Sequence, residues 1–104
     1  METKPIPLLT GVTAQGVGAQ AYNQPSQKTF NAIVTGTGAV AATINIEACN
    51  VDNAWVVLGT ITLSGNGSAA DGFYHDAPWT QIRANLTAIS GTGATVSVAM
   101  GVTV

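Results

Sequence analysis

Hydrophobic and polar residues alternate along most of the chain, and the alternation is clearest between residues 40 and 49. One side of an extended backbone there carries Val40, Ala42, Ile44, Ile46 and Ala48, and the intervening residues fall on the other side. A period of two residues is typical of a β-strand with one buried face. We therefore predict a strand in this segment, with these five side chains in the core.

The same alternation predicts further strands, separated by short segments rich in Gly, Ser and Asn. The five clear strands cover 30–34, 40–49, 55–63, 79–89 and 94–104, and weaker ones are expected at 8–14 and 73–75. Their expected core positions are Phe30, Ala32, Val34, Ile82, Ala84, Leu86, Ala88, Val96, Val98 and Met100. Gly36–Gly38 and Ser90–Gly93 are interpreted as turns, Ser64–Ser68 as a flexible loop, 50–53 as a further turn, and Gly59 as a β-bulge.

Short strands with Gly-rich connections predict an all-β fold. We expect an antiparallel β-sandwich or jelly-roll-like barrel of about six to eight short strands. Residues 28–104 form the predicted β domain, and residues 1–27 an extended N-terminal arm. Pro5 and Pro7 favour extended backbone in the arm, which we expect to order on a neighbouring molecule. The last strand lacks charge and proline, so an unprotected edge there points to a partner chain.

Composition supports the β prediction and describes an unusual surface. Val, Ile and Thr supply 32 of the 104 residues and Leu only 5, and β-branched side chains suit strands. Charged residues make up 8% of the chain, and the net charge is −2, against about 25% charged residues in ordinary soluble domains. Neutral polar groups cost less to bury than ions. We infer a surface that copies of the chain or another protein cover.

Several classes of function are excluded by what the chain lacks. The basic residues Lys4, Lys28 and Arg83 are too few to follow a phosphate backbone, which argues against nucleic acid binding. No apolar run reaches the roughly 20 residues of a membrane helix, and no secretory leader is recognisable. With one Cys and one His, neither an internal disulfide nor a Cys- or His-rich metal site is expected.

Candidate chemistry is sparse. His75 and Asp76, with Asp71, offer a weak metal or catalytic set, and Glu47, Asn50, Asp52 and Asn53 a weak calcium set; solvated loop residues and turn formation explain both more simply. We therefore predict no catalytic residue, no metal and no cofactor, and a protein that is not an enzyme.

Six residues are candidates for structural or interface roles: Arg83, Trp55, Trp79, Tyr74, and the prolines Pro5 and Pro7 of the arm. Arg83 lies in mid-strand, where it can pair with a carboxylate such as Glu47 or Asp71 and join two strands or two chains. Trp55, Trp79 and Tyr74 lie near strand ends, where they pack in the core or an interface, or alternatively stack on sugar rings of a host glycan. Cys49 falls on the outward side of its strand, and a single exposed thiol fits assembly in a reducing cytoplasm.

Two stretches resemble small virion proteins of tailed bacteriophages. They are TFNAIVTGTGAVAATINIEACNVDNAWVVLGTITLSG (Thr29–Gly65) and DAPWTQIRANLTAISGTGATVSVAMG (Asp76–Gly101), about two-thirds of the chain without the arm. Similarity to capsid cement or decoration proteins implies a β-sandwich or jelly roll that oligomerises and clamps capsid subunits. In that setting Trp79, Ile82 and Arg83 are framework residues.

The expected function is a non-enzymatic phage structural protein that binds and stabilises the capsid lattice. Its expected partners are the major capsid protein and its own copies, as a dimer or trimer, and its expected location is the capsid surface of the virion. A carbohydrate-binding module, or a small tail or fibre subunit on the virion surface, is the alternative.

Overall fold

The chain folds into a single antiparallel sheet in the computed structural model, which describes residues 3–18, 21–22, 28–50, 54–75 and 79–103. Six strands lie in the described part: β1 (Thr3–Val12), β2 (Gly16–Val17), β3 (Ala21–Tyr22), β4 (Lys28–Cys49), β5 (Val56–His75) and β6 (Gln81–Thr103). The pairings between these described strands are antiparallel. The predicted all-β class is therefore confirmed.

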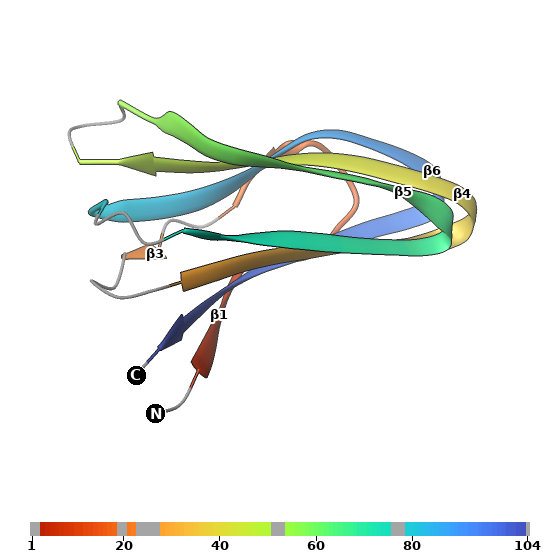
Figure 1. The fold of residues 1–104 in the computed structure, drawn as a ribbon. Coiled ribbons are helices and arrows are strands. Elements are labelled where there is room, and N and C mark those ends of the chain that lie inside the picture. The colour runs from red at the N-terminus through yellow and green to blue at the C-terminus, as the bar shows by residue number, and fades with distance from the viewer. Residues whose placement is uncertain (1–2, 19–20, 23–27, 51–53, 76–78, 104) are drawn as a thin grey trace.

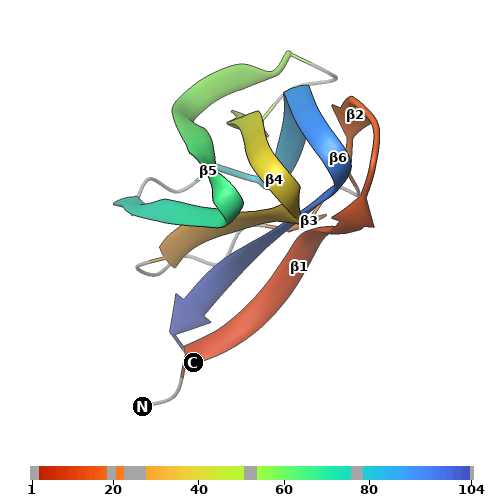
Figure 2. The ribbon, with the colours of Figure 1, turned by 90° about the vertical axis from the view of Figure 1, so that its right-hand side faces the viewer.

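Three long strands fold back on themselves and give the sheet two layers (Figure 1). The strand order is β1-β6-β4-β5, and β2 and β3 also pair with β6. The first layer contains residues 28–35 of β4, 68–75 of β5 and 95–103 of β6, together with β1. The second layer contains residues 39–49, 56–66 and 81–90 of the same three strands, with β2 and β3. Figure 2 shows β5 on one side of the molecule and β1 and β2 on the other.

A Gly-x-Gly sequence occurs at the bend of each long strand. The three sequences cover 36–38, 65–67 and 91–93, and Thr37 of β4 pairs with Thr92 of β6. The second glycine of each has a positive φ: 72° at Gly38, 84° at Gly67 and 64° at Gly93. Residues with a Cβ rarely adopt this left-handed conformation. Glycine therefore lets each strand turn the corner while sheet pairing continues on both sides.

The prediction of turns at 36–38 and 90–93 and of a flexible loop at 64–68 is wrong. Gly36–Gly38, Ser64–Ser68 and Ser90–Gly93 lie inside continuous strands, so pairs of short predicted strands merge into β4, β5 and β6. The sequence GTGA occurs at 36–39 and again at 91–94, and the two copies are neighbours at one corner, since Thr37 pairs with Thr92. Residues 50–55 join β4 to β5, and residues 76–80 join β5 to β6. Neither connection contains a Gly-x-Gly sequence.

The core lies between the two layers and follows the predicted alternation closely. Buried side chains from β4 and β6 include Phe30, Val34, Ile44, Ile82 and Met100. A Cβ added at Gly59 in the second layer would lie 2.7 Å from the ring of Phe73 in the first layer. The layers thus pack closely enough here that only glycine fits opposite the ring, which itself packs 5.2 Å from the ring of Phe30.

Two irregularities in pairing change which side chains face the core. The register of β4 with β5 shifts between Ile46 and Glu47, where Gly59 and Val57 are the partners, so Leu58 is bulged. The predicted bulge near Gly59 is confirmed. A second register shift lies between Thr43 and Ile44 of β4, whose partners on β6 are Ala88 and Leu86. Ala88 is consequently exposed, contrary to the expectation, and Ile89 packs against the core instead.

The described part of the predicted arm belongs to the same sheet. The expected strand at 8–14 overlaps β1, which starts earlier, ends at Val12 and pairs along β6 from Thr103 to Val96. Leu8 and Leu9 are buried in the core, with 3% and 7% of their surfaces exposed. The described part therefore orders on its own domain. The predicted boundary at Gln27 lies outside the described residues and stays a prediction.

β6 is an inner strand, which corrects the expected open edge at the C-terminal end. It pairs with β4 on one side and with β1, β2 and β3 on the other. Its lack of charge and proline is thus explained by pairing within the chain. Among the described strands, the two outermost in the path are β1 and β5.

Candidate functional site

The outer face of the first layer is a regular grid of uncharged residues, which we call the neutral face. Its rows, read from β5 through β4 to β6, are Tyr74–Thr29–Gly101, Gly72–Asn31–Ala99, Ala70–Ile33–Ser97 and Ser68–Thr35–Thr95. None of these twelve residues carries a charged group. Such a surface loses little solvation energy when another molecule covers it.

The grid follows directly from the alternation in β4 and β6. Its members on these two strands are the residues that lie between, or directly beside, the buried Phe30, Ala32 and Val34 of β4 and the buried Val96, Val98 and Met100 of β6. Sequence reasoning placed these core residues correctly and identified the intervening positions only as polar or mixed. The apolar member it missed is Ile33, which is 40% exposed.

Polar groups of the neutral face also bond to one another. The Thr35 and Thr95 hydroxyl oxygens lie 3.0 Å apart as a cross-strand pair, and the Ser97 hydroxyl accepts from the backbone N–H of Gly11 in β1 at 3.0 Å. These contacts hold three strands in register without using a charge.

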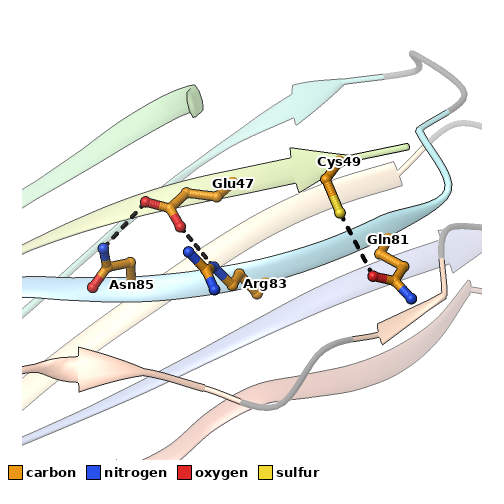
Figure 3. Close-up of polar contacts among 5 residues, drawn as sticks. All are labelled: Glu47, Cys49, Gln81, Arg83 and Asn85. Atoms are coloured by element: carbon orange, nitrogen blue, oxygen red, sulfur yellow. Dashed lines mark hydrogen bonds and ion pairs between the residues drawn. The ribbon is translucent and has the colours of Figure 1, made fainter. Parts of the chain in front are cut away.

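The outer face of the second layer contains the ion pair that the sequence suggested. Arg83 of β6 lies directly across from Glu47 of β4, and its Nε donates to Glu47 Oε1 at 2.7 Å. Asn85 Nδ2 donates to the other carboxylate oxygen at 3.1 Å (Figure 3). Of the two partners proposed for Arg83, the structure selects Glu47. The pair joins two strands of one chain, and Glu47 is buried.

Trp55 lies over this ion pair. The Arg83 guanidinium carbon is 4.1 Å from the centre of the Trp55 ring, a cation–π distance. One face of the indole therefore contacts the framework and is closed to a sugar ring. The Trp55 Nε1–H is buried and has no hydrogen-bond partner among the described residues.

The other two aromatic candidates have different surroundings. Trp79 is half-buried and packs against the core. Trp55, by contrast, contacts Arg83, which faces outward because it lies between the buried Ile82 and Ala84. The two tryptophans are thus on opposite sides of the layer and do not form one stacking platform. Tyr74 is 56% exposed on the neutral face. Pro5 and Pro7 lie in the edge strand β1, opposite Gly101 and Ala99.

Cys49 is buried, although it lies on the outward side of β4 as predicted. Only 3% of its surface is exposed, and its thiol lies 3.6 Å from Gln81 Oε1 (Figure 3). The expectation of an exposed thiol is wrong, because alternation predicts the side of the strand on which a residue lies and not its exposure.

The residues considered for metal binding or catalysis do not converge in the described part of the chain. Asp71 and His75 are four residues apart on one strand, about 13 Å at strand spacing, and Asp71 Oδ1 accepts from the Gly72 N–H at 2.8 Å. Asn50 Oδ1 accepts from the backbone N–H and the hydroxyl of Thr80. Asp52, Asn53 and Asp76 lie outside the described residues. Three or more metal-ligating side chains do not gather within the described segments.

The hollow along the β1–β2 segment offers no acid–base chemistry. It is a shallow, open space of about 400 Å³ lined by Leu9 and by residues 11–17. None of these residues has an ionisable side chain. Within the described segments, no helix is long and apolar enough to pass through a membrane.

Comparison with known proteins gives a likeness of fold. No protein-family model matches the chain, and no curated protein matches it. Among solved structures, it is similar to the crystal structure of the SPBc2 prophage-derived protein YomS, with a TM-score of 0.69. The alignment covers 98% of this chain and 94% of that chain at 10% sequence identity, so the two share a fold.

Proposed function

We propose that this chain is a non-enzymatic phage structural protein that attaches to the capsid lattice and stabilises it. The observation that carries the proposal is the neutral face, a grid of uncharged residues that includes the exposed Ile33 and Tyr74. The fold shared with a prophage-derived protein supports a phage origin. The sequence resemblance to cement and decoration proteins supports the capsid as the partner.

The size of the neutral face determines how such attachment works. Three strands about 4.8 Å apart and about seven residues long, at about 3.3 Å per residue, cover roughly 300 Å². A stable interface buries about 800 Å² on each partner. One neutral face therefore binds weakly by itself, and attachment gains strength from repetition over a symmetric shell.

The described residues give less support to binding of a host glycan. Trp55 has one face against Arg83, and Trp79 packs against the core, so no paired aromatic platform forms between them. A small tail or fibre subunit would share the same neutral surface, and the experiment below separates it from a capsid protein.

The test mixes the purified chain with heads and, separately, with tails of the phage that encodes it, and measures co-sedimentation. We expect binding to heads, and Ile33→Lys should weaken it about tenfold or more because the new charge must be desolvated in the contact. Val17→Lys is the matched control, since Val17 is 53% exposed on β2, away from the neutral face.

Two results would contradict the capsid assignment. Binding to tails alone identifies a tail subunit, and binding to neither particle removes the structural role. Equal loss in the Ile33→Lys and Val17→Lys proteins, with both folded by circular dichroism, shows that the neutral face is not the contact.

A further inference from the structure

The β5 strand is an open edge of the sheet. In the order β1-β6-β4-β5 it pairs with β4 alone among the described strands, and Figure 2 shows it on the side away from β1 and β2. An edge strand of twenty residues presents backbone N–H and C=O groups that can pair with another strand.

The two outermost strands are protected to different degrees. β1 contains Lys4, Pro5 and Pro7, and proline lacks the N–H that an added strand needs. β5 contains no proline, lysine or arginine. Its one carboxylate, Asp71, accepts from the N–H of Gly72 at 2.8 Å and so occupies one backbone donor. An incoming strand can therefore pair with β5 more easily than with β1.

Exposed apolar side chains are concentrated at this edge. Of the five large hydrophobic residues that are exposed among the described ones, Val56, Val57 and Tyr74 are on β5, and Ile33 lies on β4 next to β5. Their exposed fractions on β5 are 44%, 53% and 56%. The occupant of the edge should thus supply both a backbone ladder and apolar side chains.

A second copy of β5 meets both requirements. Val57 lies nine residues before Asn66, at the corner, and Tyr74 lies eight residues after it. Both face the outer side of the sheet, because Val57 pairs with Glu47 and Tyr74 with Thr29. The two distances differ by one residue, and the bulged Leu58 accounts for the difference because it pairs with no residue of β4. Antiparallel pairing about the corner therefore brings Val57 of one copy beside Tyr74 of the other.

We propose that two copies of this chain pair along β5, antiparallel, about a two-fold axis at Gly65–Gly67. The first half of one β5 then lies against the second half of the other, in the manner in which β4 and β5 already pair within one chain. A two-fold axis makes every contact occur twice. In this register Asp71 of each copy faces Ile61 of the other copy, so the two carboxylates do not meet. Each copy still moves one carboxylate from water into the contact.

Disulfide trapping tests the register. Val57→Cys and Tyr74→Cys proteins are purified separately, then mixed under mild oxidation, and covalent dimers are measured on non-reducing gels. We expect dimers in the mixture and few in either variant alone, because the two positions meet only across the axis. The wild type controls for Cys49, which is buried.

Sedimentation at a series of concentrations tests the energetics. Val57→Lys should raise the dissociation constant of the dimer about tenfold. Asp71→Asn should lower it by a similar factor, because the amide is cheaper to desolvate than the carboxylate. Val17→Lys, on β2, should leave it unchanged.

Several results overturn the proposal: a monomer at every concentration, equal cross-linking of each variant with itself, or an Asp71→Asn dimer no tighter than wild type. None of these measurements contains phage heads, so they are independent of the capsid assignment. If the chain dimerises but does not bind phage heads, the β5 dimer stands and the capsid assignment fails. If it binds heads only as a monomer, the β5 dimer is contradicted.

Discussion

At the scale of single residues, the contact between Arg83 and Glu47 depends on information that sequence alone does not hold. Two carboxylates, Glu47 and Asp71, were equally good partners by residue type. Strand register decided between them, because it sets Glu47 directly opposite Arg83 and leaves Asp71 on the far strand β5. The burial of Cys49 was missed for a related reason: alternation gives the side of a strand but not what covers that side.

The ion pair should contribute to stability, since it is mostly shielded from water. The side chains of Arg83 and Glu47 are 20% and 10% exposed. Glu47→Ala removes the acceptor for Arg83 and for Asn85, and we expect the free energy of unfolding to fall by about 1–3 kcal/mol. Urea unfolding followed by tryptophan fluorescence measures this loss.

The control is Thr60→Ala, which removes an exposed hydrogen bond of 2.8 Å from Thr60 of β5 to Asn45, two residues before Glu47 on β4. That loss should stay under about 1 kcal/mol. Equal losses for both variants would show that shielding does not strengthen the ion pair.

At the scale of elements, the alternating pattern predicted the core faces well and the connections poorly. The inward residues of 30–34, 40–48 and 96–100 were placed correctly. A Gly-x-Gly sequence, however, fits a hairpin turn and a strand corner equally well, because both use a positive φ. What distinguishes them is whether pairing continues past the glycines, and that depends on the neighbouring strands.

At the corner, the effect of replacing a glycine should depend on how readily the new residue adopts a positive φ. Gly38 has a φ of 72°, and a Cβ there would meet nothing within 4 Å. Gly38→Ala should therefore cost only the strain of a left-handed residue, about 1–2 kcal/mol. Gly38→Asn should cost less, since asparagine adopts this conformation more readily. Thermal unfolding of both variants would test the ranking, which a more stable alanine variant would contradict.

At the scale of the whole molecule, the N-terminal segment and the β domain share one core. Sequence reasoning separated residues 1–27 because their glycines and glutamines show few bulky anchors. Two of them, Leu8 and Leu9, are buried in the core, and β1 pairs with the first layer only. Such a segment is recognised from its partner strand rather than from its own composition.

Leu8→Ala should accordingly destabilise the entire fold. The cavity it leaves is expected to cost about 2–5 kcal/mol of unfolding free energy. Circular dichroism and tryptophan fluorescence should report one shared transition at a lower urea midpoint. Thr10→Ala, at an exposed position of β1, should have little effect. Two separate transitions, or an unchanged midpoint for Leu8→Ala, would instead show that β1 unfolds on its own.

The folded-over sheet also has a consequence for how the chain reaches this structure. Each long strand runs through both layers, so neither layer contains a contiguous piece of sequence that can assemble first. Lys28 pairs with Val102 and Thr3 with Thr103, so much of the ladder closes only after nearly the whole chain is available. Folding dominated by such distant pairings is slow. During synthesis, residues 28–35 of β4 gain their second neighbour only after residues 95–102 of β6 have been made.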